Sequence, residues 1–240
     1  MGIYGIIFYA MANKIKYFEI LDSTNQYVMR NVFILDHLSV VVAHKQKQGR
    51  GKLGRIWKSD QASNLYMSIL LKDEPRLPAV IHQLTLFASL ITTDCISRHI
   101  DSSLHLINIR WPNDVLVDKK KIAGILAESS WQGNDLLYAV LGVGLNINMS
   151  QEELDQIDQP ATSLNWYALS HIDKEDVLHS WLKIFSATWE KFLADGLDQE
   201  KLEHYITGQP DSTKDSKSDN NEQAEKKYSN YTQIIEGRTC

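Results

Sequence analysis

The sequence predicts an α+β domain in which a mixed, largely antiparallel sheet is flanked by helices. Short β-branched runs such as 39–43 (SVVVA) alternate with longer stretches whose apolar residues recur every three or four positions. The runs at 115–117 and 121–128 are separated only by a short polar turn, as in an antiparallel hairpin. Apolar residues make up 43% of the 240 residues, which is enough for a packed core.

The first half of the chain alternates strands with helices. AspSerThrAsn at 22–25 is a helix-start signal, with Asp22 or Ser23 as the expected cap, and Pro75 and Pro78 mark a turn. We therefore expect strands at 14–21, 39–43 and 64–71, and helices at 24–30 and about 79–99.

The second half repeats this alternation. The strand at 107–111 must stop at Pro112, which cannot donate to a ladder, and AspGly at 195–196 ends a long amphipathic helix. We expect further strands at 115–117, 121–128 and 136–145, and helices at 151–158, 174–194 and 199–206.

The strand at 136–145 carries an unusual face. Gly142 and Gly144 alternate with apolar residues, and Asn146 and Asn148 continue the same side of the chain. Glycine weakens a strand interior, so two glycines on one face indicate close approach by a ligand or by another backbone. A β-bulge is the alternative explanation.

A basic, glycine-rich loop follows the strand at 39–43. Within 45–57 (KQKQGRGKLGRIW) five cations surround three glycines: Lys45, Lys47, Arg50, Lys52 and Arg55 with Gly49, Gly51 and Gly54. Backbone N–H groups and cations together suit phosphate, although a basic loop of this kind can also be merely solvated. The spacing matches neither the P-loop nor the dinucleotide-binding motif.

Composition excludes several classes of protein. A net charge of -5 argues against nonspecific binding of nucleic acid by the whole surface. Cys95 and Cys240 lie far apart, which indicates neither a disulfide framework nor a metal site and is typical of a reducing, cytoplasmic compartment. We expect no segment that is apolar for long enough to span a bilayer, and hence no membrane partner.

Three regions are expected along the chain. Residues 1–13 are interpreted as a dispensable N-terminal extension, because no basic residue before Lys14 supports a signal peptide. Residues 14–207 form the main domain. Residues 208–240 form a polar tail that is predicted to be disordered, since it contains little to bury.

Four segments in this order resemble the catalytic domain of biotin protein ligases. They are 23–26 (STNQ), the glycine-rich loop, 110–114 (RWPND) with 121–126 (KIAGIL), and 142–148 (GVGLNIN). The resemblance covers about 14–205 and implies the biotin–lipoate ligase fold, which is similar to class II aminoacyl-tRNA synthetases. We expect no N-terminal helix-turn-helix module and no C-terminal SH3-like domain.

The resemblance implies an activity. Such a ligase uses ATP, with Mg²⁺, to activate biotin as biotinyl-AMP, and then transfers biotin to a lysine of a biotin carboxyl carrier domain. Bacterial members often pair through a sheet edge, so a homodimer is one expected arrangement; nucleic acid is not an expected partner. The identity of any metal ligand stays unknown.

The resemblance also implies site residues. The catalytic set is Lys121, Arg50, Lys52 and Arg55. The biotin-binding set is Ser23, Thr24, Asn25, Gln46, Gly49, Arg50, Gly51, Lys121 and Gly124. The nucleotide-binding set is Arg50, Lys52, Arg55, Trp57, Asn113, Asp114, Lys121 and Asn146. Well-known members carry two arginines where this loop has Lys52 and Leu53, which we expect to loosen retention of the adenylate.

Two alternatives remain at this level. A lipoate–protein ligase shares the fold, but the Arg-Arg-x-x-Gly-Gly-Gly segment usual in those enzymes is absent from the chain. A noncatalytic biotin-binding module would keep the pocket without the chemistry, and biotin-dependent ATP–pyrophosphate exchange separates it from an enzyme.

Overall fold

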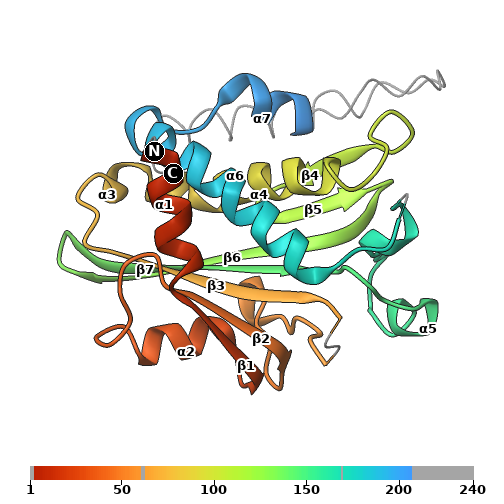
Figure 1. The fold of residues 1–240 in the computed structure, drawn as a ribbon, viewed down its shortest axis with the longest axis horizontal. Coiled ribbons are helices and arrows are strands. Elements are labelled where there is room, and N and C mark those ends of the chain that lie inside the picture. The colour runs from red at the N-terminus through yellow and green to blue at the C-terminus, as the bar shows by residue number, and fades with distance from the viewer. Residues whose placement is uncertain (1–2, 61–62, 169, 207–240) are drawn as a thin grey trace.

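The structure, a computed structural model, describes residues 3–60, 63–168 and 170–206. Its centre is a seven-stranded sheet with the order β1-β2-β3-β7-β6-β5-β4 (Figure 1). The strands are β1 (Ile15–Leu21), β2 (Val40–Gln46), β3 (Leu65–Lys72), β4 (Ile107–Arg110), β5 (Asp114–Val117), β6 (Lys120–Gln132) and β7 (Asp135–Leu145). Only β1 and β2 pair in parallel, and the other neighbours are antiparallel, which confirms the predicted fold class.

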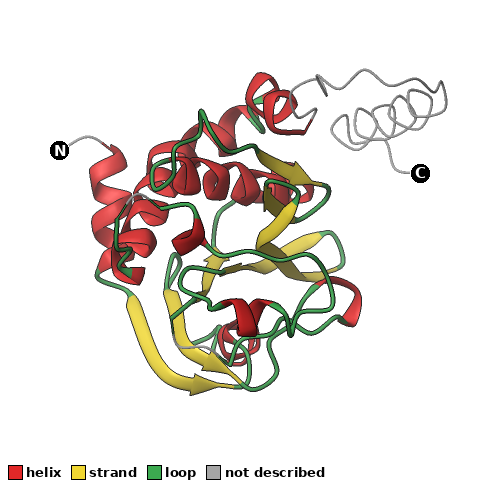
Figure 2. Ribbon diagram, turned by 90° about the vertical axis from the view of Figure 1, so that its right-hand side faces the viewer, coloured by secondary structure: helices red, strands yellow, loops and turns green. Residues whose placement is uncertain are grey.

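Helices cover both faces of the sheet. They are α1 (Ile3–Ala12), α2 (Thr24–Arg30), α3 (Leu77–Val80), α4 (Leu84–Ser97), α5 (Gln151–Leu154), α6 (Lys174–Asp195) and α7 (Gln199–Ile206), with 3₁₀ turns η1 (Lys52–Gly54), η2 (Ile81–Gln83) and η3 (Leu164–Trp166). Helices α4 and α6 lie over one face, and α2 lies on the other (Figure 1). Most helical residues gather on the α4 and α6 side (Figure 2).

The main core lies between the sheet and helices α4 and α6. Buried aromatic rings pack there in series, with the Phe185 and Trp189 centroids 4.9 Å apart. A smaller cluster, including Val28, Val41 and Leu70, lies beneath α2 on the opposite face. Burial of these side chains fixes α2 on the sheet, because apolar area removed from water is the main stabilising contribution. The start of α2 is thereby held at one end of the open sheet face.

The helical region after β3 is broken and buried. The predicted helix at 79–99 is instead α3, η2 and α4, and its core face includes Phe87 and Ile91. By length and composition the stretch Leu77–Ser97 could cross a membrane, which contradicts the expectation from sequence. However, 67% of its most apolar window is buried inside the protein, so its composition is that of a helix packed on several sides.

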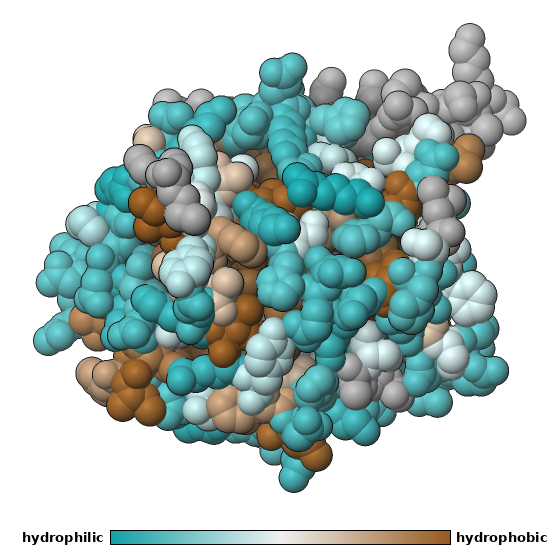
Figure 3. Space-filling view, in the orientation of Figure 1, coloured by the Kyte–Doolittle hydropathy of each residue, from teal (hydrophilic) through white to brown (hydrophobic). Residues whose placement is uncertain are grey.

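The N-terminal residues pack on the domain. Helix α1 lies against α6, the side chain of Met11 is fully buried, and the Ser186 hydroxyl lies 3.7 Å from its sulfur. Interpretation of 1–13 as a dispensable extension did not anticipate this packing, because a run without polar residues shows no helical periodicity. The face that carries α1 and α6 is otherwise largely polar (Figure 3). The tail predicted at 208–240 lies outside the described residues.

Two element lengths also differ from expectation. Helix α5 is a single turn, Gln151–Leu154, although a capping box is present: Glu153 N donates to the Ser150 hydroxyl at 3.3 Å, and Ser150 N donates to Glu153 at 2.8 Å. Strand β6 continues to Gln132 instead of ending at 128, since β7 supplies pairing partners from Ala123 to Gln132.

Candidate active site

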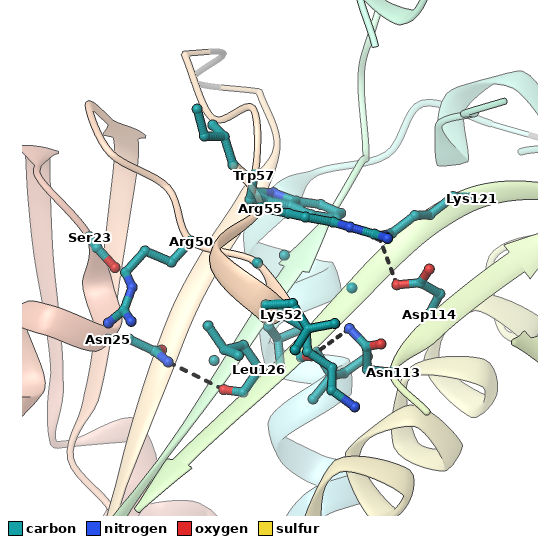
Figure 4. Close-up of a pocket in the computed structure, with 18 of the residues that line it drawn as sticks. Ser23, Asn25, Arg50, Lys52, Arg55, Trp57, Asn113, Asp114, Lys121 and Leu126 are labelled. Atoms are coloured by element: carbon teal, nitrogen blue, oxygen red, sulfur yellow. Dashed lines mark hydrogen bonds and ion pairs between the residues drawn. The ribbon is translucent and has the colours of Figure 1, made fainter. Parts of the chain in front are cut away.

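A cleft of about 520 Å³ opens on the sheet face beside the start of α2 (Figure 4). Its walls come from four sequence-distant segments: the start of α2, the glycine-rich loop, the β4–β5 turn, and strands β6 and β7. Among the predicted residues it gathers Ser23, Thr24, Asn25, Gln46, Arg50, Gly51, Lys52, Arg55, Trp57, Asn113, Asp114, Lys121 and Gly124. Gly49 and Asn146 do not line it.

The cleft floor is a connected set of buried polar groups. Gln46 Oε1 accepts from the Thr24 backbone N–H at 2.8 Å and from the Thr24 hydroxyl at 3.1 Å. The Ser68 hydroxyl donates to Asn25 Oδ1 at 2.5 Å and lies 2.7 Å from Thr24 Oγ1. Buried polar groups are costly unless hydrogen-bonded, and here each supports the next. The floor is therefore preorganised before any ligand arrives.

Ser23 is left available to the cleft. It occupies the N-cap position of α2, but its hydroxyl makes no capping hydrogen bond, contrary to one of the two caps expected. Asp22 instead accepts from Ser23 N at 2.8 Å and pairs with Arg30 at 2.5 Å. The Arg30 hydrogen bond lowers the pKa of Asp22, so this carboxylate stays charged at the helix start.

Gly49 closes the base of the glycine-rich loop. A Cβ there would lie 2.1 Å from Ser59 Oγ and 2.3 Å from the Trp57 carbonyl oxygen, so no larger residue fits. Trp57 N–H donates to Gly49 O at 2.9 Å, and Gly51 N–H donates to Arg55 O at 2.7 Å. Gly49 therefore shapes the loop instead of facing the cleft, where it was predicted to contact biotin.

The loop cations differ in their surroundings. Arg50 Nη1 lies 2.9 Å from Glu128 Oε1, and Lys52 Nζ lies 5.6 Å from the centre of a Trp111 ring. Arg55 lines both the cleft and a neighbouring pocket of about 590 Å³. The tip between them is exposed and includes Leu53, whose φ of 58° is left-handed.

A β-bulge places Lys121 in the cleft. Leu116 pairs with Lys121 and Val115 pairs with Ala123, so Ile122 is an extra residue in β6. Ile122 and Ala123 both face the core, whereas Lys121 stays on the cleft side with Gly124. The bulge is therefore the reason that Lys121 faces the cleft.

Asp114 orients the Lys121 ammonium. Lys121 Nζ lies 2.7 Å from Asp114 Oδ1 (Figure 4). Arg110 Nη2 donates to the other carboxylate oxygen, Asp114 Oδ2, at 2.6 Å. The Lys121 and Asp114 side chains are only 12% and 11% exposed. An ion pair this shielded is stronger than a surface pair and holds the amine in one place.

Trp57 lies flat against the glycine face of the sheet. A Cβ at Gly144 would be 2.5 Å from the indole, and one at Gly124 would be 2.7 Å away. Lys121 Nζ lies 5.0 Å from the centre of the Trp57 ring. The third glycine, Gly142, makes room for Asn25. Pairing with β6 is regular at Gly142 and Gly144, so close approach of side chains, and not a bulge at these positions, explains the alternating glycines.

Two predicted nucleotide-binding residues have structural partners. Asn146 is buried, and its Nδ2 donates to Thr162 O at 2.9 Å; it lines the neighbouring pocket and not the cleft. Asn113 Nδ2 donates to Ile125 O at 3.2 Å while lining the cleft. Their predicted contacts with nucleotide stay predictions.

Sequence reasoning missed Ser68 and Glu128. Ser68 joins Thr24 to Asn25, and Glu128 contacts Asn25 and Arg50. Alternation along 121–128 could have placed Glu128 on the same face as Gly124, but nothing local marks Ser68 within the run 64–71. Over the described ranges, no group of three or more His, Cys, Asp or Glu side chains could hold a metal ion.

The fold is that of a family of protein ligases. Residues 17–146 match the biotin/lipoate A/B protein ligase family, and the chain belongs to that family. This confirms the resemblance found in the sequence motifs.

The individual relatives are named as ligases, several of them as biotin ligases. The bifunctional ligase/repressor BirA of Bacillus subtilis is 31% identical over 173 residues, which are 71% of this chain and 52% of that protein. The biotin–[acetyl-CoA-carboxylase] ligase of Mycobacterium tuberculosis is 34% identical over 125 residues, 52% of this chain and 44% of that protein. The chain spans about half the length of such curated relatives.

A solved structure with ligands shows the same fold. The biotin protein ligase from Aquifex aeolicus in complex with biotin and ATP superposes with a TM-score of 0.60 at 27% identity. The match covers 80% of this chain and 78% of that chain.

Proposed function

We propose that this chain is an ATP-dependent biotin protein ligase that forms biotinyl-AMP and transfers biotin to a lysine of a biotin carboxyl carrier domain. One observation carries the proposal: the preorganised polar floor lies in the same cleft as Lys52, Arg55 and Lys121. A neutral ureido ring suits hydroxyl and amide groups, and a carboxylate beside a polyphosphate needs cations. The relatives named as biotin–[acetyl-CoA-carboxylase] ligases support the same interpretation.

In the first step, a biotin carboxylate oxygen attacks the α-phosphorus of ATP. A carboxylate–phosphate bond forms, the bond to the bridging oxygen breaks, and pyrophosphate leaves. Both reactants are anionic, so the barrier is lowered by fixed positive charge at the point of attack. Lys121, held by Asp114, provides such a charge from the sheet, and Lys52 and Arg55 provide it from the loop.

In the second step, the neutral amine of a carrier lysine attacks the acyl carbon of the mixed anhydride. The amide bond forms, AMP leaves with the electrons of the acyl–oxygen bond, and the amine loses its proton to solvent. No enzyme nucleophile is required, because the anhydride is already activated.

Mg²⁺ is part of the proposal as the companion of ATP. Lack of a ready-made metal cluster within the described part of the chain is compatible with Mg²⁺, which is usually held by phosphates, water and one or two carboxylates. Asp114 in the cleft and Asn146 in the neighbouring pocket bear side-chain oxygens that would hold the ion. When bound, the ion neutralises phosphate charge.

The partners are also proposals. A carrier domain must bring its lysine to the cleft mouth. A homodimer could form through β1, which is an edge strand of the sheet and pairs only with β2 within the described residues. Light scattering at several concentrations tests that assembly.

Biotin-dependent ATP–pyrophosphate exchange tests the function, followed by transfer to a carrier domain on a streptavidin blot. We expect exchange with biotin and none with lipoate. Exchange with lipoate would instead identify a lipoate–protein ligase. Binding of biotin without exchange, at saturating ATP and Mg²⁺, would identify a noncatalytic module.

A further inference from the structure

Glu128 is a carboxylate beside the cleft that we propose binds anions, in contact with Asn25 and Arg50 of its wall. It lies in β6 opposite Val140, and its side chain is only 21% exposed. A negative charge at such a place opposes the binding of ATP and the biotin carboxylate, and partial burial of the charge is itself costly. Its presence therefore calls for a compensating role.

Each carboxylate oxygen of Glu128 has its own partner. Oε2 accepts from Asn25 Nδ2 at 2.8 Å, and Oε1 lies 2.9 Å from Arg50 Nη1. One side chain of the sheet thus joins the start of α2 to the glycine-rich loop. Hydrogen bonds to charged groups are roughly twice as strong as neutral ones, so both contacts are substantial.

The contact with Asn25 sets the orientation of its amide. Asn25 Nδ2 faces two acceptors, Glu128 Oε2 and the Leu126 carbonyl oxygen at 3.3 Å. The flipped amide would place its oxygen against both, which is repulsive. Oδ1 must therefore face the Ser68 hydroxyl, and the floor presents one defined pattern of donors and acceptors to a ring.

The contact with Arg50 fixes the base of the glycine-rich loop. Arg50 pairs with Ile56 across the loop, so a tie at Arg50 restrains both of its ends. In this arrangement the guanidinium neutralises Glu128 instead of standing free for phosphate. Lys52 and Arg55 are left as the loop cations for the nucleotide.

We propose that Glu128 is a positioning residue, which orients the Asn25 amide for the biotin ring with one carboxylate oxygen and ties the glycine-rich loop to the pocket floor through Arg50 with the other. This proposal deepens the proposed ligase function and rests on it. It separates two consequences: the amide contact governs affinity for biotin, and the Arg50 contact governs order in the loop.

Glu128→Gln tests both contacts, because an amide has a single acceptor oxygen and cannot accept from both Asn25 and Arg50. In pyrophosphate exchange we expect the KM for biotin to rise about tenfold or more, on the scale of a lost charged hydrogen bond, with the KM for ATP changed less than about twofold. Limited trypsin digestion of the ligand-free protein should cut within 50–58 several-fold faster. Glu74→Gln is the matched control: Glu74 is also mostly shielded and pairs with Arg76, far from the cleft, so neither readout should change.

An Arg50→Gln background separates the effect of Glu128 on the loop from its effect on biotin binding. There Glu128→Gln should no longer accelerate tryptic cutting at Lys52, Arg55 or Lys58, but it should still raise the KM for biotin through Asn25. Circular dichroism melts check that each variant is folded. If Glu128→Gln does not fold, Glu128→Asp replaces it, since a side chain one methylene shorter reaches only one partner.

Equal tryptic rates in wild type and Glu128→Gln would overturn the loop tie. A loss of turnover with both KM values unchanged, or a raised requirement for Mg²⁺, would overturn the positioning role and indicate a direct catalytic or metal-binding one. Absence of exchange in the wild-type protein would overturn the proposed function, and with it the proposed role of Glu128 in biotin binding. The tryptic comparison would still decide whether Glu128 ties the loop.

Discussion

The pocket floor and the glycine-rich loop are neighbours in the cleft but differ in how they are held. On the floor, Asn25 is 3% exposed and Ser68 is fully buried, whereas Leu53 and Ile56 in the loop are both 86% exposed. The floor groups sit on a helix start and on strands, and they bond one another. From Gly49 to Trp57 the backbone hydrogen bonds join the loop to itself, whereas Lys47 and Gln48 before it donate to Leu21 and Asp22.

This difference matches the two kinds of ligand proposed. A neutral ring is recognised by fixed donors and acceptors, and rigidity there reduces the entropy lost on binding. A polyphosphate is recognised by charge, which acts over longer distances and tolerates movement. We therefore expect substitutions on the sheet side to cost more activity than substitutions in the loop.

The largest effect is expected for Lys121→Ala. Loss of a preorganised cation held by Asp114 should reduce adenylate formation about a hundredfold or more, measured by pyrophosphate exchange. Lys120→Ala is the control, because the neighbouring Lys120 is exposed and should have no such effect. Unchanged exchange in folded Lys121→Ala would mean that the rigid side of the cleft does not carry the chemistry.

Gly144→Ala should follow, with about a tenfold loss in kcat/KM for biotin. The added Cβ would lie 2.5 Å from the Trp57 indole, a rigid ring that must move. If displacement of Trp57 is the cause, Gly144→Ala should add little to Trp57→Ala in a double-mutant cycle. Full additivity would indicate that the ring does not rest on this glycine in solution.

Arg50→Gly probes the loop. Loss of its tie to Glu128 should loosen retention of the adenylate several-fold, with a smaller effect on exchange itself. Released biotinyl-adenylate labels exposed lysines, so the measurement is a streptavidin blot of an added inert protein incubated with biotin and ATP. Arg76→Gly, at an exposed ion pair far from the cleft, serves as control. Equal labelling by wild type and Arg50→Gly would place adenylate retention elsewhere.

The smallest effect is expected for Leu53→Asn. Leu53 has φ 58°, a left-handed conformation that asparagine adopts more readily than leucine, and it buries little. The free energy of unfolding, measured in urea, should rise by at most about 1 kcal/mol, and the rate of ATP–pyrophosphate exchange should change less than about twofold. A clear loss of stability would mean that the loop tip packs against the domain.

Helix α2 and the strands were predicted from the sequence better than the details of the glycine-rich loop and the termini. Helix α2 begins and ends at the expected residues, Thr24 and Arg30, because its start signal is local. Alternation identified the glycine face of β7. Contacts between distant segments, such as Ser68 with Asn25, depend on strand register and leave no local pattern.

The same limit applies to the position of Lys121. Within 121–126 strict alternation puts Lys121 with Ala123 and opposite to Gly124. Only pairing with β5 reveals that Ile122 is an extra residue. Likewise, α1 lacks the polar positions that would have marked one of its faces as buried.

The bulge at Ile122 also bears on how the strand tolerates insertions and deletions. Because β6 has one extra residue, Ile122 and Ala123 both point to the core, while Lys121 stays on the cleft face with Gly124. Deletion of Ile122 would remove the bulge, and alternation back from Ala123 would keep Lys121 on the cleft face opposite Leu116. We expect the cost of that deletion to be the loss of the fully buried Ile122 side chain from the core, about 2–5 kcal/mol on the scale of large-to-small core substitutions, whereas single-residue changes of length in the exposed turn at 118–119 should be accommodated.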